Sequence, residues 1–212
     1  MALLALALLV LYLALAIGVR TLRHRRSRGS SGFRGISGRP GSAEWTGGVL
    51  FVVAIVLVFA APVLDLASVL APVPWLDGPL GHVLGLVLFS LGLVGTLAAQ
   101  AAMGPSWRIG VDEAERTELV TMGPFAVVRN PIFAAMLPAV LGVALLVPNA
   151  VALAGFVALF VALELQVRLV EEPYLLRAHG DRYAEYAART GHFVPGVGRL
   201  RRGYNKERQS YG

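Results

Sequence analysis

Four stretches of this sequence contain no Asp, Glu, Lys or Arg, and each is long enough to cross a bilayer. They cover residues 1–19, 45–64, 78–107 and 130–163, and a membrane-spanning helix takes about 20 apolar residues. Only 15% of the chain is charged, against roughly 25% in an ordinary soluble domain. A soluble globule of this composition would expose large apolar patches, and a disordered chain would carry more charge. The sequence therefore predicts an all-α, polytopic integral membrane protein.

The longest of these runs, residues 130–163, predicts two helices. A single helix, rising about 1.5 Å per residue, would be much longer than the apolar core of a bilayer, which is about 30 Å thick. Pro148-Asn149 is a turn signal, so we expect a fourth span near 131–147 and a fifth near 150–170. The first run lacks a basic start and a convincing cleavage site, so we expect a retained span and not a signal peptide. About five transmembrane helices result.

The 19 basic residues are confined to one side of this predicted topology. They lie between spans one and two, between spans three and four, or at and beyond the end of span five. Cytoplasmic loops carry an excess of Lys and Arg, so the pattern predicts an external N-terminus and a cytoplasmic C-terminal helical segment. The plasma membrane of a prokaryote is the expected location.

We expect three regions along the chain. Residues 1–102 hold the first three transmembrane helices and a basic cytoplasmic loop at 20–44, residues 103–195 form a core with helices four and five, and residues 196–212 form a flexible tail. The basic loop is rich in Ser and Gly and lies beside a span, which favours contact with anionic membrane lipids over a nucleic acid. No obligate protein partner is evident from the sequence.

Cysteine is absent from the chain, which excludes disulfides, thiolate nucleophiles and metal sites built on cysteine. The four histidines show no H-x-x-x-H or comparable spacing, so no metal site is predicted. Chemistry is therefore expected from the polar residues of the cytoplasmic side.

A polar stripe follows the apolar part of the fifth predicted span. Glu164, Arg168, Glu171 and Glu172 recur at spacings that place them along one helical face. Ionisable residues beside a span are costly unless they pair or face a polar cavity, so we expect the two adjacent glutamates to be exposed or cavity-facing. The alternative is an internal pair of Glu164 with Arg168 that extends to the membrane interface. Pro173 is expected to kink or restart the helix.

The segment after the stripe has signals for two short helices. Gly180 is expected to end one helix and Asp181 to cap another, on which Tyr183 and Tyr186 share a face. Taken alone, these tyrosines are more typical of interfacial anchors than of ligand contacts.

The start of the fourth span has a helix-start signal of its own. Asn130 is a capping residue type, and Pro131 loses nothing at the first helical position by lacking an N–H. The N–H groups at such a helix start suit a carboxylate or another electron-rich group. A simple helix start is the plainer interpretation of this pair.

Taken together, these segments resemble the isoprenylcysteine carboxyl methyltransferases, membrane enzymes that are also similar to bacterial phospholipid methyltransferases. The sequence LVTMGPFAVVRNPIF, which begins at Leu119, is similar to the family's Leu-Val-x-x-Gly turn followed by Arg-His-Pro-x-Tyr. The sequence EEPYLLRAHGDRYAEY, which begins at Glu171, is similar to Glu-Glu-x-x-Leu followed by Gly-x-x-Tyr-x-x-Tyr. Arg189 and Pro195 match a weaker C-terminal part of the pattern.

The resemblance implies an enzyme that binds S-adenosyl-L-methionine on the cytoplasmic side. It would transfer the methyl group to a lipid-like or prenylated small amphiphile that enters laterally between helices. Arg168 and Glu171 are the expected catalytic residues, because both could orient the acceptor. The expected cofactor-binding residues are Leu119, Val120, Gly123, Asn130, Pro131, Phe133, Glu172, Tyr183 and Tyr186.

Three alternatives remain open at this stage. The third span carries no charged residue, whereas members of the resembled family that methylate a prenylcysteine carboxylate have an arginine there, so a phospholipid N-methyltransferase is an alternative. An NADPH enzyme similar to sterol reductases is a second, and a non-enzymatic membrane protein is a third.

The distribution of basic residues makes a direct prediction about topology. A reporter fused after Gly212 should be cytoplasmic, and one inserted near Asp77 should be external, because every Lys and Arg then lies on the cytoplasmic side. Paired phosphatase and fluorescent-protein fusions measure this directly. Finding both reporters on one side would contradict the five-span topology.

Overall fold

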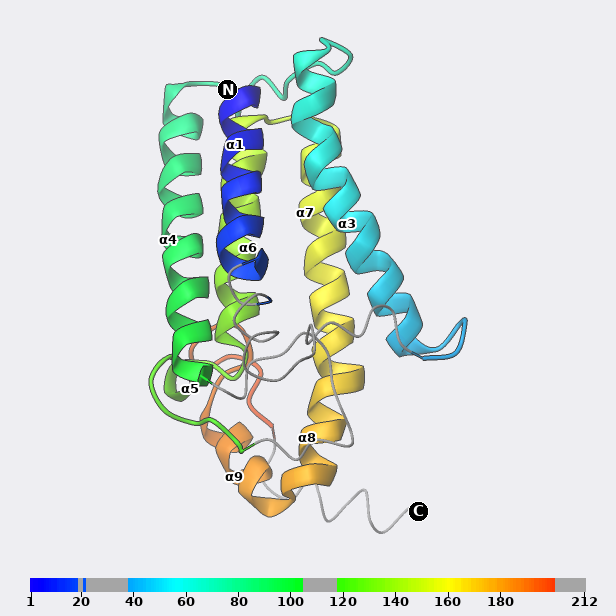
Figure 1. The fold of residues 1–212 in the computed structure, drawn as a ribbon, viewed down its shortest axis with the longest axis vertical. Coiled ribbons are helices and arrows are strands. Elements are labelled where there is room, and N and C mark those ends of the chain that lie inside the picture. Colours follow the sequence, from blue (N-terminus) through cyan, green and yellow to red (C-terminus); the bar gives the residue numbers. More distant parts are fainter. Residues whose placement is uncertain (19–20, 22–37, 105–117, 201–212) are drawn as a thin grey trace.

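The protein is described by a computed structural model over residues 1–18, 21, 38–104 and 118–200. Within these residues the regular structure is helical, and one isolated bridge joins Val128 to Gly191. The predicted all-α class is confirmed for this part of the chain. The bundle in Figure 1 consists of α1 (Ala2–Leu13) with its π-helical continuation η1 (Ala14–Gly18), α3 (Ala43–Leu66), α4 (Pro79–Met103), α6 (Pro131–Leu146) and α7 (Ala150–Leu165).

Three of the described helical segments are long and apolar enough to cross a membrane. They are Ala43–Leu66, Pro79–Met103 and Ala150–His179. Two shorter apolar helices, Ala2–Gly18 and Pro131–Leu146, stand beside them in the bundle. All of these helices fall close to the predicted spans, while the count of five crossings stays a prediction.

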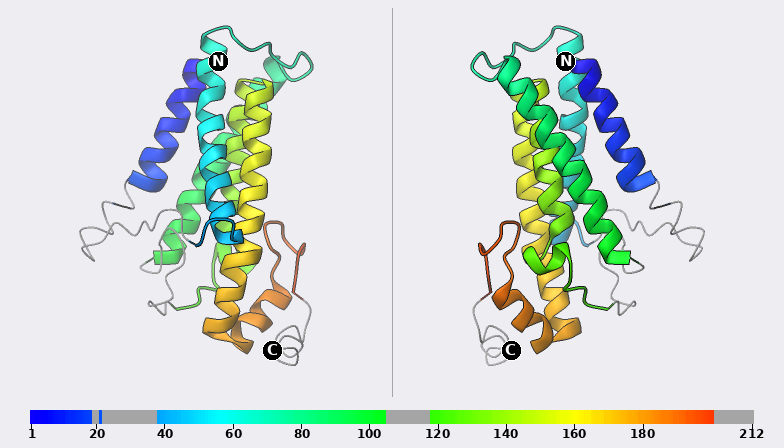
Figure 2. Two further views of the ribbon diagram at one scale, coloured as in Figure 1. Left: turned by 90° about the vertical axis from the view of Figure 1, so that its right-hand side faces the viewer. Right: turned by 90° about the vertical axis from the view of Figure 1, so that its left-hand side faces the viewer.

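The two ends of the bundle differ in what they carry. The N-terminus and the connections from α3 to α4 and from α6 to α7 lie at one end (Figure 1). The short helices α5 (Pro124–Val127), α8 (Glu172–His179) and α9 (Asp181–Arg189) lie at or beyond the other end (Figures 1 and 2). The predicted basic loop at 20–44 and tail at 196–212 lie largely outside the described residues.

The turn between α6 and α7 depends on one buried side chain. The Asn149 side-chain oxygen Oδ1 accepts a hydrogen bond from the Ala152 N–H at 2.9 Å and so caps α7. Its amide nitrogen donates to the Ala61 carbonyl of α3 at 3.2 Å. The helix break predicted at Pro148-Asn149 is confirmed, and the same asparagine also attaches the turn to a third helix.

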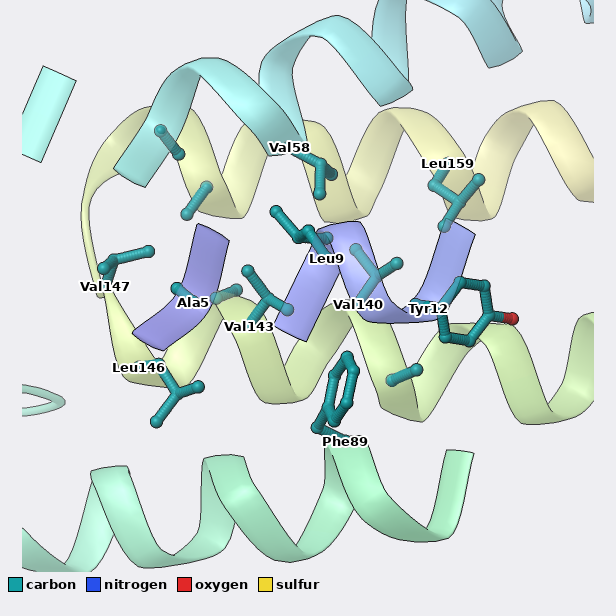
Figure 3. Packing of buried hydrophobic residues seen from close by; sticks show 14 of the residues in the cluster. Ala5, Leu9, Tyr12, Val58, Phe89, Val140, Val143, Leu146, Val147 and Leu159 are labelled. Atoms are coloured by element: carbon teal, nitrogen blue, oxygen red, sulfur yellow. The ribbon is translucent and has the colours of Figure 1, made fainter. Parts of the chain in front are cut away.

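The helices pack in two close pairs, α4 with α6 and α3 with α7. Glycines make the first pair close: a Cβ on Gly92 would stand 2.5 Å from the Ala139 nitrogen, and one on Gly142 would stand 2.5 Å from the Gly85 carbonyl oxygen. Small residues let helix backbones approach, and van der Waals packing then holds the pair together in lipid. Figure 3 shows the side chains that fill the space between the pairs, among them Leu9, Val58, Val140, Val143 and Phe89.

Helix α1 is attached to α4 by polar groups as well as by packing. The buried Tyr12 hydroxyl and Thr96 hydroxyl are 2.9 Å apart, and the Gln100 amide nitrogen donates to the Ala16 carbonyl at 2.9 Å. A lone polar group in an apolar interior is costly, so these bonds favour one register of α1 on the bundle.

The helix that begins as α7 changes its winding before Pro173. Residues Gln166–Glu171 form the π-helical segment η3, and α8 begins at Glu172 with the proline in its first turn. Proline has no N–H and its ring clashes with the carbonyl four residues earlier, which explains a local change of winding. The helix runs on from Ala150 to His179 without a break, so this change of winding is all that the structure shows of the predicted kink or restart. The predicted cap is wrong, because Gly180, with φ of +53°, is the residue between the helices and Asp181 is the first residue of α9.

The contact between α4 and α6 predicts a sharp sensitivity at Gly92. Gly92→Ala should destabilise the protein by roughly 1–3 kcal/mol, because the new methyl group overlaps backbone atoms that cannot move aside. Gly78→Ala is the matched control, since a Cβ there meets nothing within 4 Å. Thermal unfolding in detergent measures both variants, and an equal melting temperature for the two would contradict the close backbone contact.

Candidate functional site

The site is organised around Arg129, a guanidinium that is 5% exposed. It stands just before α6, and it donates to groups from three separate segments. The Nε and Nη2 atoms donate to Glu172 Oε1 of α8 at 3.1 and 2.5 Å. The Nη1 atom donates to the carbonyls of Ala187 and Thr190 at 3.0 and 2.6 Å, and Nη2 also donates to the Gly198 carbonyl at 2.9 Å. One side chain thereby joins the start of α6 to α8, to α9 and to the segment after it.

Backbone pairing brings the same segments together. The Arg129 N–H donates to the Gly191 carbonyl at 2.8 Å, and the Asn130 N–H donates to the His192 carbonyl at 3.3 Å. Val128 and Gly191 form the isolated bridge. The chain after α9 therefore runs back along the residues that lead into α6, which places His192 beside the arginine.

Glu172 is buried, with 9% of its side chain exposed. Besides Arg129, its Oε1 atom faces the His192 ring, whose Nδ1 is 3.3 Å away. Glu172 is therefore not an exposed carboxylate, because a buried guanidinium requires a buried counter-charge. Its role in cofactor binding stays a prediction.

The polar stripe divides between two environments. Glu164 pairs with Arg168, whose side chain is 59% exposed, so the alternative of an internal pair is what the structure shows. Glu164 also points its Oε1 atom toward His192 Nε2 at 3.8 Å. Glu164 and Glu172 therefore both face the His192 imidazole. The Arg168 side chain is exposed, and Glu171 is half-buried. The acceptor-orienting roles of Arg168 and Glu171 stay predictions.

The two predicted tyrosines are buried against each other and against α8. Tyr183 is 1% exposed, and its ring meets Tyr186 edge to face with centroids 6.1 Å apart. The Tyr186 hydroxyl donates to the Phe125 carbonyl of α5 at 2.6 Å. Burial raises the pKa of Tyr186 to about 12, although nearby Arg129 lowers it in part, so this phenol remains a donor at neutral pH. Burial also raises the pKa of Tyr183.

The loop residues predicted to bind the cofactor lie near this cluster. Leu119 packs against the cluster that contains both tyrosines, and Val120 is half-buried. Gly123 has φ of +61° and precedes α5, a conformation that favours glycine. Residues 105–117 of the same predicted loop lie outside the described residues.

The start of α6 has the donors that the sequence predicts but lacks the predicted cap. Pro131 is its first residue, and the Asn130 side chain makes no capping hydrogen bond. Within the described residues the buried Asn130 Nδ2 atom has no hydrogen-bond partner. Phe133 packs against the bundle core. The helix start therefore carries an amide donor of unassigned function.

Sequence reasoning missed Arg129 and His192 as members of the site. Arg129 counted toward topology and lay in the segment compared with Arg-His-Pro-x-Tyr, but it was given no role in the site, and His192 was considered only as a possible metal ligand. A signal existed for the arginine, because an ionisable residue at the edge of a span needs a partner and two glutamates follow the next span. Among the described residues, no three His, Asp or Glu side chains form a group suited to a metal ion.

The segments that form this site were compared with known proteins. Residues 80–182 match the family described as phospholipid methyltransferase. The predicted resemblance is confirmed over this segment. It runs from α4 to the start of α9 and includes both Arg129 and Glu172. This segment of the chain is therefore similar to phospholipid methyltransferases.

One curated relative has a different description. The chain is similar to the nickel-cobalt-cadmium resistance protein NccN of Alcaligenes xylosoxydans xylosoxydans, with 28% identity over 109 residues, which is 51% of this chain and 50% of the relative. The chain therefore spans about half the length of this relative. No solved structure matches the chain.

The buried ion pair makes a prediction about stability. Arg129→Met should destabilise the fold by about 3–5 kcal/mol, because it leaves the Glu172 carboxylate buried without its counter-charge. Arg168→Met removes the same group from an exposed pair and should cost less than about 1 kcal/mol. Denaturant unfolding in detergent compares the two variants, and a loss at Arg129 no larger than that at Arg168 would show that the buried pair is not what holds these segments together.

Proposed function

We propose that the protein is an S-adenosyl-L-methionine-dependent methyltransferase of the membrane, acting on a lipid-like amphiphile. The observation that carries this proposal is the match of residues 80–182 to the phospholipid methyltransferase family. The matched segment contains the helix start at Asn130, the buried pair of Arg129 with Glu172, and most of the predicted cofactor-binding residues.

The polar groups at this end of the bundle fit the cofactor's polar part. A methionine carboxylate needs donors, and the unpartnered Asn130 Nδ2 atom and the first turn of α6 are donors. An amine or ribose hydroxyl needs acceptors. Arg129 and His192 both contact Oε1 of Glu172, and this carboxylate is the proposed acceptor. Leu119 and Val120 offer apolar contacts beside these groups.

When bound, the cofactor supplies an electrophilic methyl group on a positively charged sulfur. The protein's part is to hold that methyl in line with a nucleophile and away from water. Arg129 serves this indirectly: its bonds fix Glu172 and the backbone at Ala187, Thr190 and Gly198 around the start of α6. Arg168 and Glu171 are proposed to orient the acceptor from the partly exposed side.

The acceptor is proposed to reach the site from the bilayer. The apolar helices around the site favour a substrate with a hydrocarbon chain that moves laterally between them. A phospholipid N-methyltransferase is the alternative within the same chemistry. A sterol-reductase-like NADPH enzyme and a non-enzymatic membrane protein are the alternatives outside it, and the metal resistance in the relative's name is not carried over to this chain.

The proposed location follows from the basic residues. With the N-terminus outside, α8 and α9 lie on the cytoplasmic side, where S-adenosyl-L-methionine is made. Anionic lipids of a prokaryotic plasma membrane are the proposed neighbours of the basic loop.

Titration of the detergent-solubilised protein with S-adenosylhomocysteine and with NADPH tests the proposal. We expect saturable binding of S-adenosylhomocysteine and none of NADPH, measured by calorimetry. Glu172→Gln should weaken the binding about tenfold or more, which corresponds to about 1.4 kcal/mol. Glu185→Gln, the same change at an exposed position of α9, should leave the affinity within about twofold.

Binding of NADPH alone would support the reductase alternative, and binding of neither ligand would support a non-enzymatic protein. Because Glu172 is also part of the buried pair, the melting temperature of each variant is measured beside its affinity. Unchanged affinity in a folded Glu172→Gln variant would remove this residue from the cofactor site.

A further inference from the structure

The segment that follows α9, residues 190–198, exposes apolar side chains at its tip. We call it the return loop, because it runs from α9 back toward the helix bundle (Figure 2). Val194 is 56% exposed and Val197 is 61% exposed, and Pro195 between them is exposed as well. The sequence from 186 to 206 contains no Asp or Glu. A loop in water is usually polar, so this tip calls for a different surrounding.

The return loop lies against the bundle and not beyond its end. Phe193, beside the exposed tip, is half-buried and packs against the apolar core of the bundle. The preceding His192 has its Nε2 atom 3.8 Å from Glu164 Oε1 of α7. Gly191 forms the bridge with Val128, just before α6. The loop is thus attached to the ends of two apolar helices.

The contact with α7 gives the depth of the loop. Helix α7 begins at Ala150, and at 1.5 Å per residue Glu164 lies about 21 Å along it. The apolar core of a bilayer is about 30 Å thick. In the five-span topology predicted above, α7 begins at the outer face, so the contact of His192 with Glu164 lies in the cytoplasmic part of the apolar layer. Val194 and Val197 follow His192 within five residues.

The backbone of the return loop is suited to an apolar surrounding, because many of its polar groups are paired. The His192 N–H donates to the Val197 carbonyl at 2.7 Å, and the Val197 N–H donates to the Val194 carbonyl at 3.1 Å. Pro195 has no N–H to satisfy. Hydrogen bonds are also accepted by the carbonyls of Thr190, Gly191, His192 and Gly198. Unpaired backbone groups would oppose transfer into lipid at several kcal/mol each.

We propose that the return loop inserts into the cytoplasmic leaflet of the bilayer, with Val194 and Val197 among the acyl chains. Charge favours lipid as the occupant over another protein surface. Arg189 and Arg199 flank the loop and are exposed, so a cation stands at each end of an apolar tip. Long basic side chains beside an inserted segment extend to the headgroups and attract anionic lipids. The inference does not depend on the proposed methyltransferase activity.

Insertion would also position the polar site. The Thr190 and Gly198 carbonyls, at the two ends of the return loop, both accept hydrogen bonds from the Arg129 guanidinium. A loop held in the leaflet therefore keeps Arg129 and its partners close to the lipid headgroups.

The test uses single cysteines, because the chain has none of its own. Val194→Cys carries an environment-sensitive fluorophore in the full-length protein, reconstituted in vesicles of phosphatidylcholine and phosphatidylglycerol. Its fluorescence is quenched either by nitroxides on the acyl chains or by iodide in water. Val157→Cys, on α7 and also 56% exposed, is the control for contact with lipid. Glu185→Cys, exposed on α9, is the control for contact with water at the same end of the bundle.

We expect acyl-chain nitroxides to quench the probe at Val194 within about twofold of the probe at Val157. Iodide should quench it at least about threefold less than the probe at Glu185, because the apolar layer excludes the ion. Both orientations of the protein in the vesicles affect Val194 and Glu185 equally, so the comparison holds for a mixed population.

Two results would overturn the proposal. Quenching by iodide as strong as at Glu185, with little quenching by the nitroxides, places the loop in water. Protection from both quenchers shows that protein covers the tip, such as a second copy of the chain. Neither result affects the proposed methyltransferase, whose cofactor titration is independent of this measurement.

A second position keeps the proposal testable if Val194→Cys does not fold. Val197→Cys changes the other exposed side chain of the tip, where little packing is lost, and the melting temperature of each labelled variant in detergent shows whether it is folded. The probe at Val197 should give the same lipid-accessible and iodide-protected result. A folded Val197→Cys variant that is quenched like Glu185→Cys would overturn insertion of the loop.

Discussion

A guanidinium buried at the end of a helix bundle needs a counter-charge and an acceptor for each of its hydrogens. Arg129 obtains these from Glu172 and from the carbonyls of Ala187, Thr190 and Gly198. These groups come from α8, from α9 and from the segment after it, so each must lie where the arginine can reach it. An unpaired charge in such a position would cost several kcal/mol. The packing of α8, α9 and residues 190–198 against the start of α6 therefore depends on this one side chain.

The packing of the helix bundle fixes the position of Arg129. Arg129 leads directly into α6, and α6 packs against α4 so closely that glycines are required at Gly85, Gly92 and Gly142. Contact between backbones leaves little freedom to slide or tilt, unlike contact between long side chains. The apolar part of the protein thus acts as a rigid support, and the chemistry-bearing residues are attached at its end.

The same requirement for pairing also gives His192 its orientation. Because both hydrogens of Arg129 Nη2 are in use, the imidazole donates to Glu172 and presents its other nitrogen toward Glu164. A group that helps to hold the fold together thereby also orients the His192 imidazole. This coupling means that stability and activity should be measured together in every variant of the site.

Much of the fold could be predicted because its determinants are local. The sequence by itself determined where the helices lie, since uncharged runs, Pro148-Asn149 and Pro173 act on the residues beside them. Even local signals left details open: Gly180 and not Asp181 stands between α8 and α9, because both helix ends meet at a backbone with positive φ that glycine adopts easily.

Only the tertiary structure decided which polar groups meet. Arg129 and Glu172 are 43 residues apart, and Arg129 and His192 are 63 apart, so no helical spacing relates them. The polar stripe predicted an accessible Glu172, and the fold buried it, since the charge that it faces comes from another helix. Composition and periodicity determine which surfaces are apolar, but the pairing of charges depends on distances that exist only once the helices have packed.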